Sequence, residues 1–213
     1  MQSILFFGDS LTWGFDAKTG KRFPDDIRFT GIIREHFSEI RIIEEGLKGR
    51  TNSFDDSIEE WRNGYKALPM LLNSHDPLDL VVIMLGTNDC KRKFNCSAGE
   101  IAAALAKNIR IIRTPSFWDG EKVPDILIVC PPEISTDYKG TKMEEQFNKW
   151  SRKVSHKLPK EYQRIAKEYG CAYLDANEVT AVSSTDGVHL DEKGHKELAD
   201  ALEAKIRWIL NIQ

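Results

Sequence analysis

No apolar run in this 213-residue sequence approaches the roughly 20 residues that a membrane-spanning helix needs. The apolar start Ile4-Leu5-Phe6-Phe7 is too short for the core of a signal peptide and lacks a basic leader. The formal net charge is −3 and there is no basic stripe, which argues against nucleic-acid binding. These absences predict a cytoplasmic protein that engages neither membranes nor nucleic acids.

Cysteine is scarce, and the four cysteines form no recognisable framework. Cys130 and Cys171 lie in apolar runs, where cysteine acts as a small hydrophobic residue. Cys90 and Cys96 could pair or bind a metal, but their spacing matches no zinc signature and no histidine lies nearby. We therefore expect no metal site.

The chain has the length of one globular domain, residues 1–213, and contains no repeat, linker or low-complexity tract. Short apolar runs that are typical of buried strands alternate with stretches of helical period. The expected strands are Ile4 to Phe7, Arg41 to Glu44, Leu80 to Leu85, Ile126 to Cys130 and Cys171 to Leu174. This alternation predicts an α/β fold with three layers, in which helices cover both faces of a central parallel sheet of about five strands.

Helix start signals lie between these runs. Ser97 and Thr141 each begin a capping-box sequence, and Asp191 is the expected cap of the last helix. Pro159 should end or kink the helix that starts at Thr141. A shorter helix is expected around residues 30–37.

The polar residues of greatest interest follow the expected strands. Ser10 comes after the first strand, Gly49 after the second, Asn88 after the third, and Asp186 and His189 after the last. In open parallel sheets, ligands bind beyond the carboxyl ends of the strands. The sequence therefore predicts that these five residues gather at one edge of the sheet.

Ser10, in the run Gly8-Asp9-Ser10-Leu11, is the expected nucleophile. Turn or N-cap residues of this kind are often only structural. Of the five histidines, His189 alone has a carboxylate three residues upstream with a glycine between, in Asp186-Gly187-Val188-His189. A histidine aligned by a carboxylate is the usual base for a serine nucleophile.

Asn88, in Gly86-Thr87-Asn88-Asp89, has a side-chain amide that could donate to an oxyanion. The backbone N–H groups of Gly49 and Ser10 could add two further donors. A plain strand-to-helix turn is the structural alternative for this segment. No Gly-x-Ser-x-Gly string is present, which argues against the nucleophile elbow of ordinary α/β-hydrolases.

Taken together, these residues resemble the SGNH (GDSL) hydrolase superfamily, with four blocks in the family's order. The closer likeness is to its intracellular aryl esterase/acyltransferase branch, through Phe7-Gly8-Asp9-Ser10-Leu11-Thr12-Trp13-Gly14, Glu44-Glu45-Gly46-Leu47, Arg50-Thr51 and Ile83-Met84-Leu85-Gly86-Thr87-Asn88-Asp89. The resemblance implies a flavodoxin-like sheet, a Ser–His–Asp mechanism, no cofactor and short-chain esters as substrates. It also implies an oxyanion hole formed by Ser10, Gly49 and Asn88, and a homo-oligomer.

Other conspicuous residues are given structural interpretations. Trp61, Phe117 and Trp118 are expected to be packing or subunit contacts. Trp13, three residues after Ser10, is the aromatic residue expected to contact substrate. The run Lys91-Arg92-Lys93 is expected to be a solvated surface.

The leading hypothesis is a serine esterase that acts on small acetyl or aryl esters through an acyl-enzyme, with transfer to alcohols as a further possible outcome. A carbohydrate O-acetylesterase would use the same residues and is not separated from it by sequence. The alternative from another class is a non-catalytic flavodoxin-like binding domain, in which Ser10, Asn88, Asp186 and His189 would all be structural.

Overall fold

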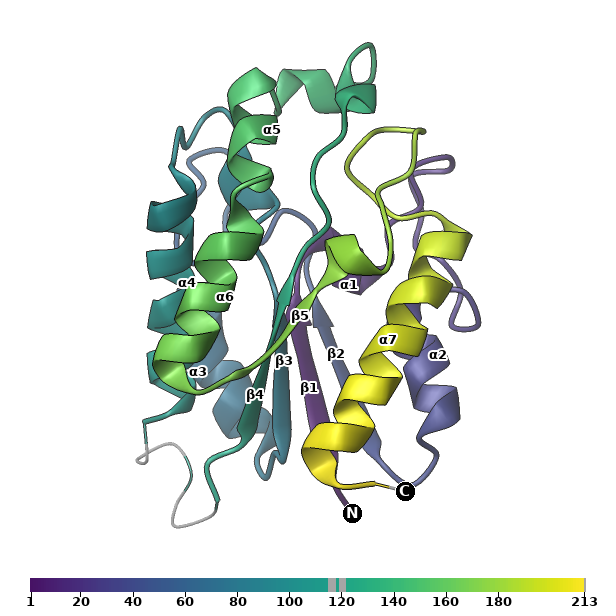
Figure 1. Ribbon diagram of the computed structural model, residues 1–213, viewed down its shortest axis with the longest axis vertical. Coiled ribbons are helices and arrows are strands. Elements are labelled where there is room, and N and C mark those ends of the chain that lie inside the picture. The colour runs from purple at the N-terminus through teal and green to yellow at the C-terminus, as the bar shows by residue number, and fades with distance from the viewer. Residues whose placement is uncertain (115–117, 119–121, 213) are drawn as a thin grey trace.

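A sheet of five parallel strands forms the centre of the computed structural model, which describes residues 1–114, 118 and 122–212 (Figure 1). The strand order is β2-β1-β3-β4-β5, and every neighbouring pair is parallel. The strands are β1 (Ser3–Gly8), β2 (Arg41–Gly46), β3 (Leu80–Met84), β4 (Asp125–Cys130) and β5 (Ala172–Asp175). Each overlaps its predicted range, so the predicted central parallel sheet is confirmed.

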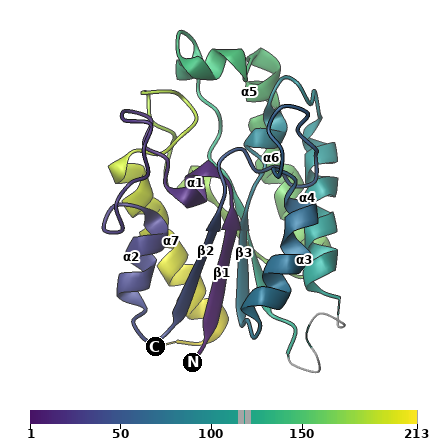
Figure 2. The ribbon, with the colours of Figure 1, turned by 180° about the vertical axis from the view of Figure 1, so that it is seen from behind.

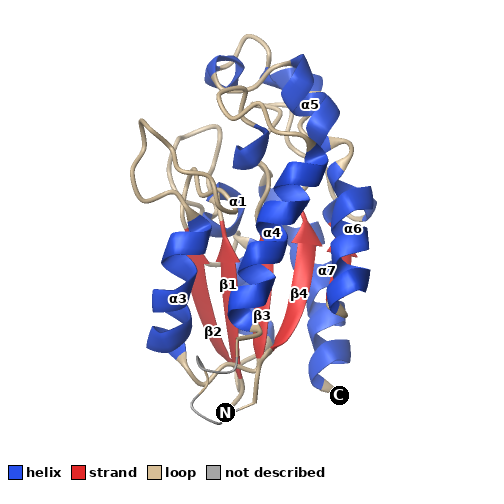
Figure 3. Cartoon of the chain, turned by 90° about the vertical axis from the view of Figure 1, so that its left-hand side faces the viewer, coloured by secondary structure: helices blue, strands red, loops and turns tan. Residues whose placement is uncertain are grey.

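Helices cover both faces of the sheet and give the predicted three layers (Figures 1 and 2). One side carries α3, α4 and α6, and the other carries α2 and α7, which pack against each other. Figure 3 shows α3 and α4 in front of the sheet and α7 beyond it. The helices are α1 (Ser10–Trp13), α2 (Phe29–His36), α3 (Gly64–His75), α4 (Ala98–Ile112), α5 (Lys149–Ser155), α6 (Leu158–Tyr169) and α7 (Glu192–Leu210).

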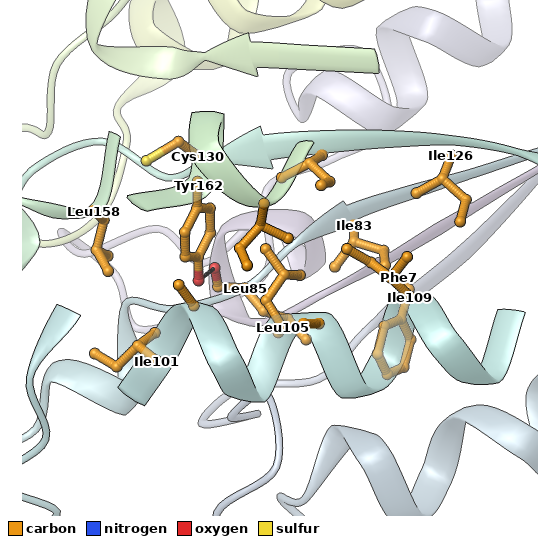
Figure 4. Packing of buried hydrophobic residues seen from close by; sticks show 14 of the residues in the cluster. Phe7, Ile83, Leu85, Ile101, Leu105, Ile109, Ile126, Cys130, Leu158 and Tyr162 are labelled. Carbon is orange, nitrogen blue, oxygen red and sulfur yellow. Dashed lines mark hydrogen bonds between the residues drawn. The ribbon is translucent and has the colours of Figure 1, made fainter. Parts of the chain in front are cut away.

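The core consists of two apolar layers separated by the sheet. Strand side chains alternate between faces, so Leu5 and Phe7 of β1 join the cluster under α3, α4 and α6. Ile4 and Phe6 of the same strand join the cluster under α2 and α7. Figure 4 shows the first cluster, where Phe7 lies with side chains of α4 and α6. Burial on both faces explains why the central strands are continuously apolar.

Most of the predicted helix boundaries are confirmed. Ser97 closes a capping box at the start of α4, and the Asp191 carboxylate accepts the Gly194 N–H at 2.9 Å to cap α7. Pro159 lies in the first turn of α6, where its missing N–H has no helical partner to lose.

The helix predicted to begin at Thr141 starts later. Thr141 caps a short 3-10 helix, Lys142–Glu145, and α5 begins after Asn148. Asn148 forms a reciprocal capping box with Ser151, which outweighs the Thr141 signal. The sequence also gave no expectation of α3, because Pro69 interrupts its interior.

Candidate active site

The five predicted site residues lie at the carboxyl edge of the sheet, at the top of Figure 1. Ser10 follows β1 and Asn88 follows β3, while Asp186 and His189 lie in the loop that precedes α7. Gly49 follows β2. The parallel sheet therefore brings together residues that are up to 179 positions apart in sequence.

Ser10 is held at the start of the short helix α1. The Asp9 carboxylate accepts the Leu11 N–H at 2.9 Å and caps the helix. Gly14 ends the helix in a left-handed conformation, with φ of 82°. This tight turn leaves the Ser10 side chain 7% exposed at the end of β1.

A continuous hydrogen-bonded chain joins Ser10 to Asp186 through His189. His189 Nε2 lies 2.9 Å from Ser10 Oγ, and His189 Nδ1 lies 2.6 Å from Asp186 Oδ2. A carboxylate only accepts, so the proton of the neutral imidazole lies on Nδ1. Nε2 is then the acceptor that faces the Ser10 hydroxyl.

The Asp186–His189 turn is fixed by its own backbone. Asp186 Oδ1 accepts the N–H groups of Val188 and His189 at 3.0 and 2.9 Å. Gly187 has a φ of +70°, and a Cβ there would lie 2.3 Å from the Tyr138 nitrogen. Burial opposes ionisation of Asp186, but its hydrogen bonds to His189 and Val188 prevail and lower its pKa. Asp186 is therefore a carboxylate that can stabilise a positive charge on His189.

The other histidines lie away from Ser10. His36, His75 and His156 each face a glutamate at 2.6 to 3.0 Å. His195 is buried beside Phe29, whose N–H donates to its Nδ1 at 3.3 Å. Burial lowers the pKa of His195 to about 4, so its ring is neutral.

Asn88 and Gly49 both line the space in front of Ser10. The Asn88 amide donates to the buried Asp9 carboxylate at 3.1 Å, which fixes its orientation. Arg50 follows Gly49 and donates to the carbonyl of Gly8 at 3.0 Å, so it ties the Gly49 loop to the end of β1. Gly49 itself has a φ of +82°, the left-handed region that favours glycine.

A buried polar layer supports the Asn88 segment from beneath. Asp89 accepts the Asn52 N–H at 3.0 Å, and the Asn52 amide also donates to Tyr162 Oη at 3.2 Å. Tyr162 Oη donates in turn to the carbonyl of Leu85 at 2.8 Å, at the end of β3 (Figure 4). The sequence provides no local signal for Asn52 or Tyr162, because their roles arise only when distant segments meet.

A cavity of about 140 Å³ lies in front of Ser10; we call it the Ser10 cavity. Its apolar wall includes Phe15, whose ring centroid lies 4.5 Å from that of His189. Trp13, the aromatic residue expected to contact substrate, is not among the described residues that line this cavity; it lies behind Phe15, with 6.4 Å between ring centroids. Phe15 was missed because nothing in the sequence distinguishes it from Trp13.

Two further expectations about side chains are corrected and one is confirmed. Lys91 is 4% exposed and lines the Ser10 cavity, so the run at 91–93 is not simply a solvated surface. Trp61 is 83% exposed and does not pack within the chain. Trp118 is buried and its Nε1 donates to the Ile112 carbonyl at 2.8 Å, as a packing residue should. Phe117 lies outside the described residues.

The four cysteines are free thiols. Across residues 1–114, 118 and 122–212, no group of three or more His, Cys, Asp or Glu side chains is placed to hold a metal ion. In the same residues, no helix combines the length and apolar character needed to cross a membrane.

Comparisons with known proteins agree with this geometry. Residues 4–202 match the family described as GDSL-like Lipase/Acylhydrolase. A carbohydrate acetylesterase family member from Sinorhizobium meliloti has a similar structure, with a TM-score of 0.93, 33% identity and coverage of 99% of this chain and 100% of that chain. The native aryl esterase of M. smegmatis gives a TM-score of 0.92 and 32% identity, over 98% of this chain and 100% of that chain.

An acetylxylan esterase from Xylanibacter ruminicola is 23% identical over 217 residues. The match covers 96% of this chain but only 43% of that protein, so this chain corresponds to less than half of it. The chain belongs to the GDSL-like lipase/acylhydrolase family, and with it to the carboxylic ester hydrolases. The resemblance drawn from the sequence blocks is thereby confirmed.

Proposed function

We propose that this protein is a serine esterase that hydrolyses short-chain acyl esters, acetyl and aryl esters among them. The observation that carries the proposal is the chain from Ser10 Oγ to His189 Nε2 at 2.9 Å and from His189 Nδ1 to Asp186 at 2.6 Å. Each distance is within hydrogen-bond reach, as nucleophile, base and orienting carboxylate require.

In the proposed mechanism, Ser10 Oγ attacks the ester carbonyl carbon while His189 Nε2 takes the hydroxyl proton. Asp186 stabilises the imidazolium that forms. The oxyanion is stabilised by the Asn88 amide and by the N–H groups of Ser10 and Gly49. Collapse of the tetrahedral intermediate expels the alcohol, which receives the proton from His189. Water then attacks the acyl-enzyme with His189 as base again, and releases the acid and free Ser10.

The size of the Ser10 cavity supports small acyl groups. Its volume of about 140 Å³ is below the roughly 300–1,000 Å³ that is typical of small-molecule sites. The apolar part of its wall, which includes Phe15, Phe147 and Val188, suits an acetyl or other short acyl chain. An apolar mouth also favours an alcohol over water at the acyl-enzyme, so we propose acyl transfer to alcohols as a side reaction. Gas chromatography of the esters formed with added 1-butanol measures that partition.

A covalent probe tests the proposal directly. A fluorophosphonate should attach to Ser10, and peptide mass spectrometry should find the adduct on Ser10 and on no other serine. Ser10→Ala should abolish the labelling, while Ser183→Ala, a change of the same kind in the loop after β5, should leave it intact. Failure of the folded wild-type protein to react would favour the non-catalytic binding domain.

Carbohydrate O-acetylesterase activity is the second candidate. The polar wall of the Ser10 cavity supports it, because Lys48, Glu59, Lys91 and Gln146 could bind sugar hydroxyl groups. The similarity to a carbohydrate acetylesterase family member points the same way. Comparison of kcat/KM for phenyl acetate and for acetylated xylose distinguishes the two candidates.

We also propose a homo-oligomer in a reducing cytoplasm. Ile58, Trp61 and Met70 are 81%, 83% and 67% exposed, and apolar side chains this exposed favour a subunit contact. The four free cysteines fit a reducing compartment. Light scattering should give a multiple of the 24.3 kDa chain mass, and Trp61→Glu should lower it.

A further inference from the structure

Lys91 is a buried cation in the wall of the Ser10 cavity. Its side chain is 4% exposed, although lysine is almost never buried unless it is paired. The residue follows the Asn88–Cys90 3-10 helix, so the chain brings its ammonium group to the same cavity as Ser10 and Asn88. This position in the site requires an explanation beyond surface solvation.

The charge of Lys91 is only partly balanced. Among the described residues, its one ion-pair partner is Glu59, with 3.7 Å between Nζ and Oε2, beyond hydrogen-bond distance. Glu59 also faces Arg62, with 3.8 Å between Oε1 and Nη2, and its side chain is 45% exposed. One half-exposed carboxylate is thus shared between two cations. Burial lowers the pKa of Lys91, so an anion placed against the ammonium would be strongly favoured.

A second cation lies across the same cavity. Lys48 Nζ stands 4.7 Å from the Trp13 ring centroid and 5.9 Å from that of Phe15, and no carboxylate partner is found for it in the described part of the chain. The Ser10 cavity therefore has two lysines against the single shared carboxylate of Glu59.

The Ser10 cavity adjoins a larger cleft that shares its charged wall. Glu59, Lys91 and Gln146 line both spaces, and the cleft has a volume of about 480 Å³. Arg92, Lys93 and Glu145 line the rest of the cleft together with Ile58, and Lys93 pairs with the buried Asp56. The small cavity suits the acyl group, so the bulkier alcohol part of an ester extends past Lys91 into the cleft.

We propose that Lys91 determines specificity, and that the preferred esters carry a carboxylate on their alcohol part that binds the Lys91 ammonium. This inference rests on the proposed esterase function and names its substrate class. The carboxylate would supply the hydrogen bonds and the full counter-charge that Glu59 does not provide. A charge-assisted hydrogen bond in a buried site is worth between about 10-fold and 100-fold in kcat/KM.

Two esters that differ only in charge test the inference: 4-acetoxybenzoate and its methyl ester. Each kcat/KM is divided by the rate constant of alkaline hydrolysis, because the two leaving groups differ in reactivity. The wild-type protein should favour the anionic ester on this scale. Lys91→Met, which keeps the length of the side chain, should lower the anionic-to-neutral ratio at least about 10-fold, through KM more than kcat.

A second variant should shift the ratio in the opposite direction. Glu59→Gln removes the competing carboxylate from an exposed position and should raise the anionic-to-neutral ratio about 2-fold to 5-fold. This variant tests the inference even if Lys91→Met fails to fold. Lys160→Met, the same substitution at an exposed position on α6 that lines neither space, should leave the ratio unchanged.

Three outcomes would overturn the inference: no anionic preference in the wild type, an equal loss for both esters in Lys91→Met, or an unchanged ratio in Glu59→Gln. An equal loss would mean that Lys91 supports the site and not the substrate. Ser10→Ala in the same assays keeps the proposed function separate. If hydrolysis of both esters depends on Ser10 but shows no charge preference, the esterase proposal stands and the specificity proposal fails.

Discussion

The Asn88 amide donates a hydrogen bond to the Asp9 carboxylate over 3.1 Å, although the two residues are 79 positions apart. The same carboxylate accepts the Leu11 N–H and caps the helix that begins at Ser10. One buried group therefore sets the position of both the proposed nucleophile and a proposed oxyanion donor. Burial raises the pKa of Asp9 to about 6, against the opposing effect of these hydrogen bonds.

Asn88→Ala should lower kcat about 10²-fold to 10³-fold, because a donor to the oxyanion is lost. KM should change much less, since the donor acts mainly in the transition state. Steady-state kinetics with p-nitrophenyl acetate measure both constants. A folded Asn88→Ala protein with wild-type kcat would remove Asn88 from the mechanism.

Asp9→Asn checks that Asn88 must be held by a carboxylate. The substitution keeps the size of the side chain but turns one acceptor into a donor, so Asp9 can no longer satisfy both Leu11 and Asn88. We expect kcat to fall about 10-fold or more, with the far-UV circular dichroism unchanged. The double variant Asp9→Asn/Asn88→Ala should be no slower than Asn88→Ala alone, because the two residues act through one contact.

Gly187→Ala should damage the Asp186–His189 turn. A Cβ at Gly187 would lie 2.3 Å from the Tyr138 nitrogen, so the turn must shift and move His189 away from Ser10. We expect a loss of about 10²-fold in kcat, because misplacement of a reacting group by about 1 Å has effects of that size.

Gly170→Ala is the matched control for this change. Gly170 also has a positive φ, 58°, but a Cβ there meets no atom within 4 Å. It should reduce the free energy of unfolding by about 1 kcal/mol and leave kcat unchanged. Equal kcat losses in the two variants would show that backbone strain, and not the position of the turn, affects activity.

The sequence was a good guide wherever local chemistry decides the outcome. Ser97 and Asp191 cap helices as predicted because their side chains bond to backbone only three residues away. The gathering of Ser10, Asn88 and His189 followed from strand order alone, because parallel strands end at one edge. Their hydrogen-bond distances, in contrast, required the structure.

The failures occurred where tertiary packing decides. Lys91 has the sequence context of a surface lysine, and only the folded chain encloses it beside Ser10. Helix α3 tolerates Pro69 because Leu68 and Leu72 are buried in the core on either side of it. Tyr162 meets Asn52 across 110 positions, and no sequence spacing encodes such a contact.

Asp89 makes a prediction about stability and pH. Burial raises its pKa from an ordinary value near 3.8 to about 7, and the Asn52 hydrogen bonds only partly oppose this. The folded state thus binds the proton more tightly than the unfolded state. This group's contribution to stability is complete below about pH 4 and is lost as the pH rises through about 7.

Asp89→Asn removes that titration. The deficit in unfolding free energy of the variant, relative to wild type, should shrink by roughly 1 kcal/mol or more between pH 4.5 and pH 7. Urea unfolding at several pH values measures this difference and cancels groups of opposite sign, such as Asp186. A deficit that grows with pH would mean that Asp89 is ionised throughout this range.

Phe15 and Trp13 should differ in their effect on aryl esters. Phe15 lines the Ser10 cavity beside His189, whereas Trp13 packs behind it under Lys48. Phe15→Leu should raise KM for phenyl acetate about 5-fold to 10-fold, because the ring lost is in contact with the site. Trp13→Leu should have less than half of that effect. The reverse order would restore the sequence-based prediction that Trp13 contacts substrate.

The central claim is that Ser10 is the nucleophile, and hydrolysis of p-nitrophenyl acetate by the wild type and Ser10→Ala tests it most directly. Both proteins should show the same circular dichroism and melting temperature within about 2 °C, since the change removes one oxygen. We predict that kcat falls by a factor on the order of 10⁶, to the background rate, as in other serine triads. A folded Ser10→Ala protein that retains the wild-type rate would contradict the account.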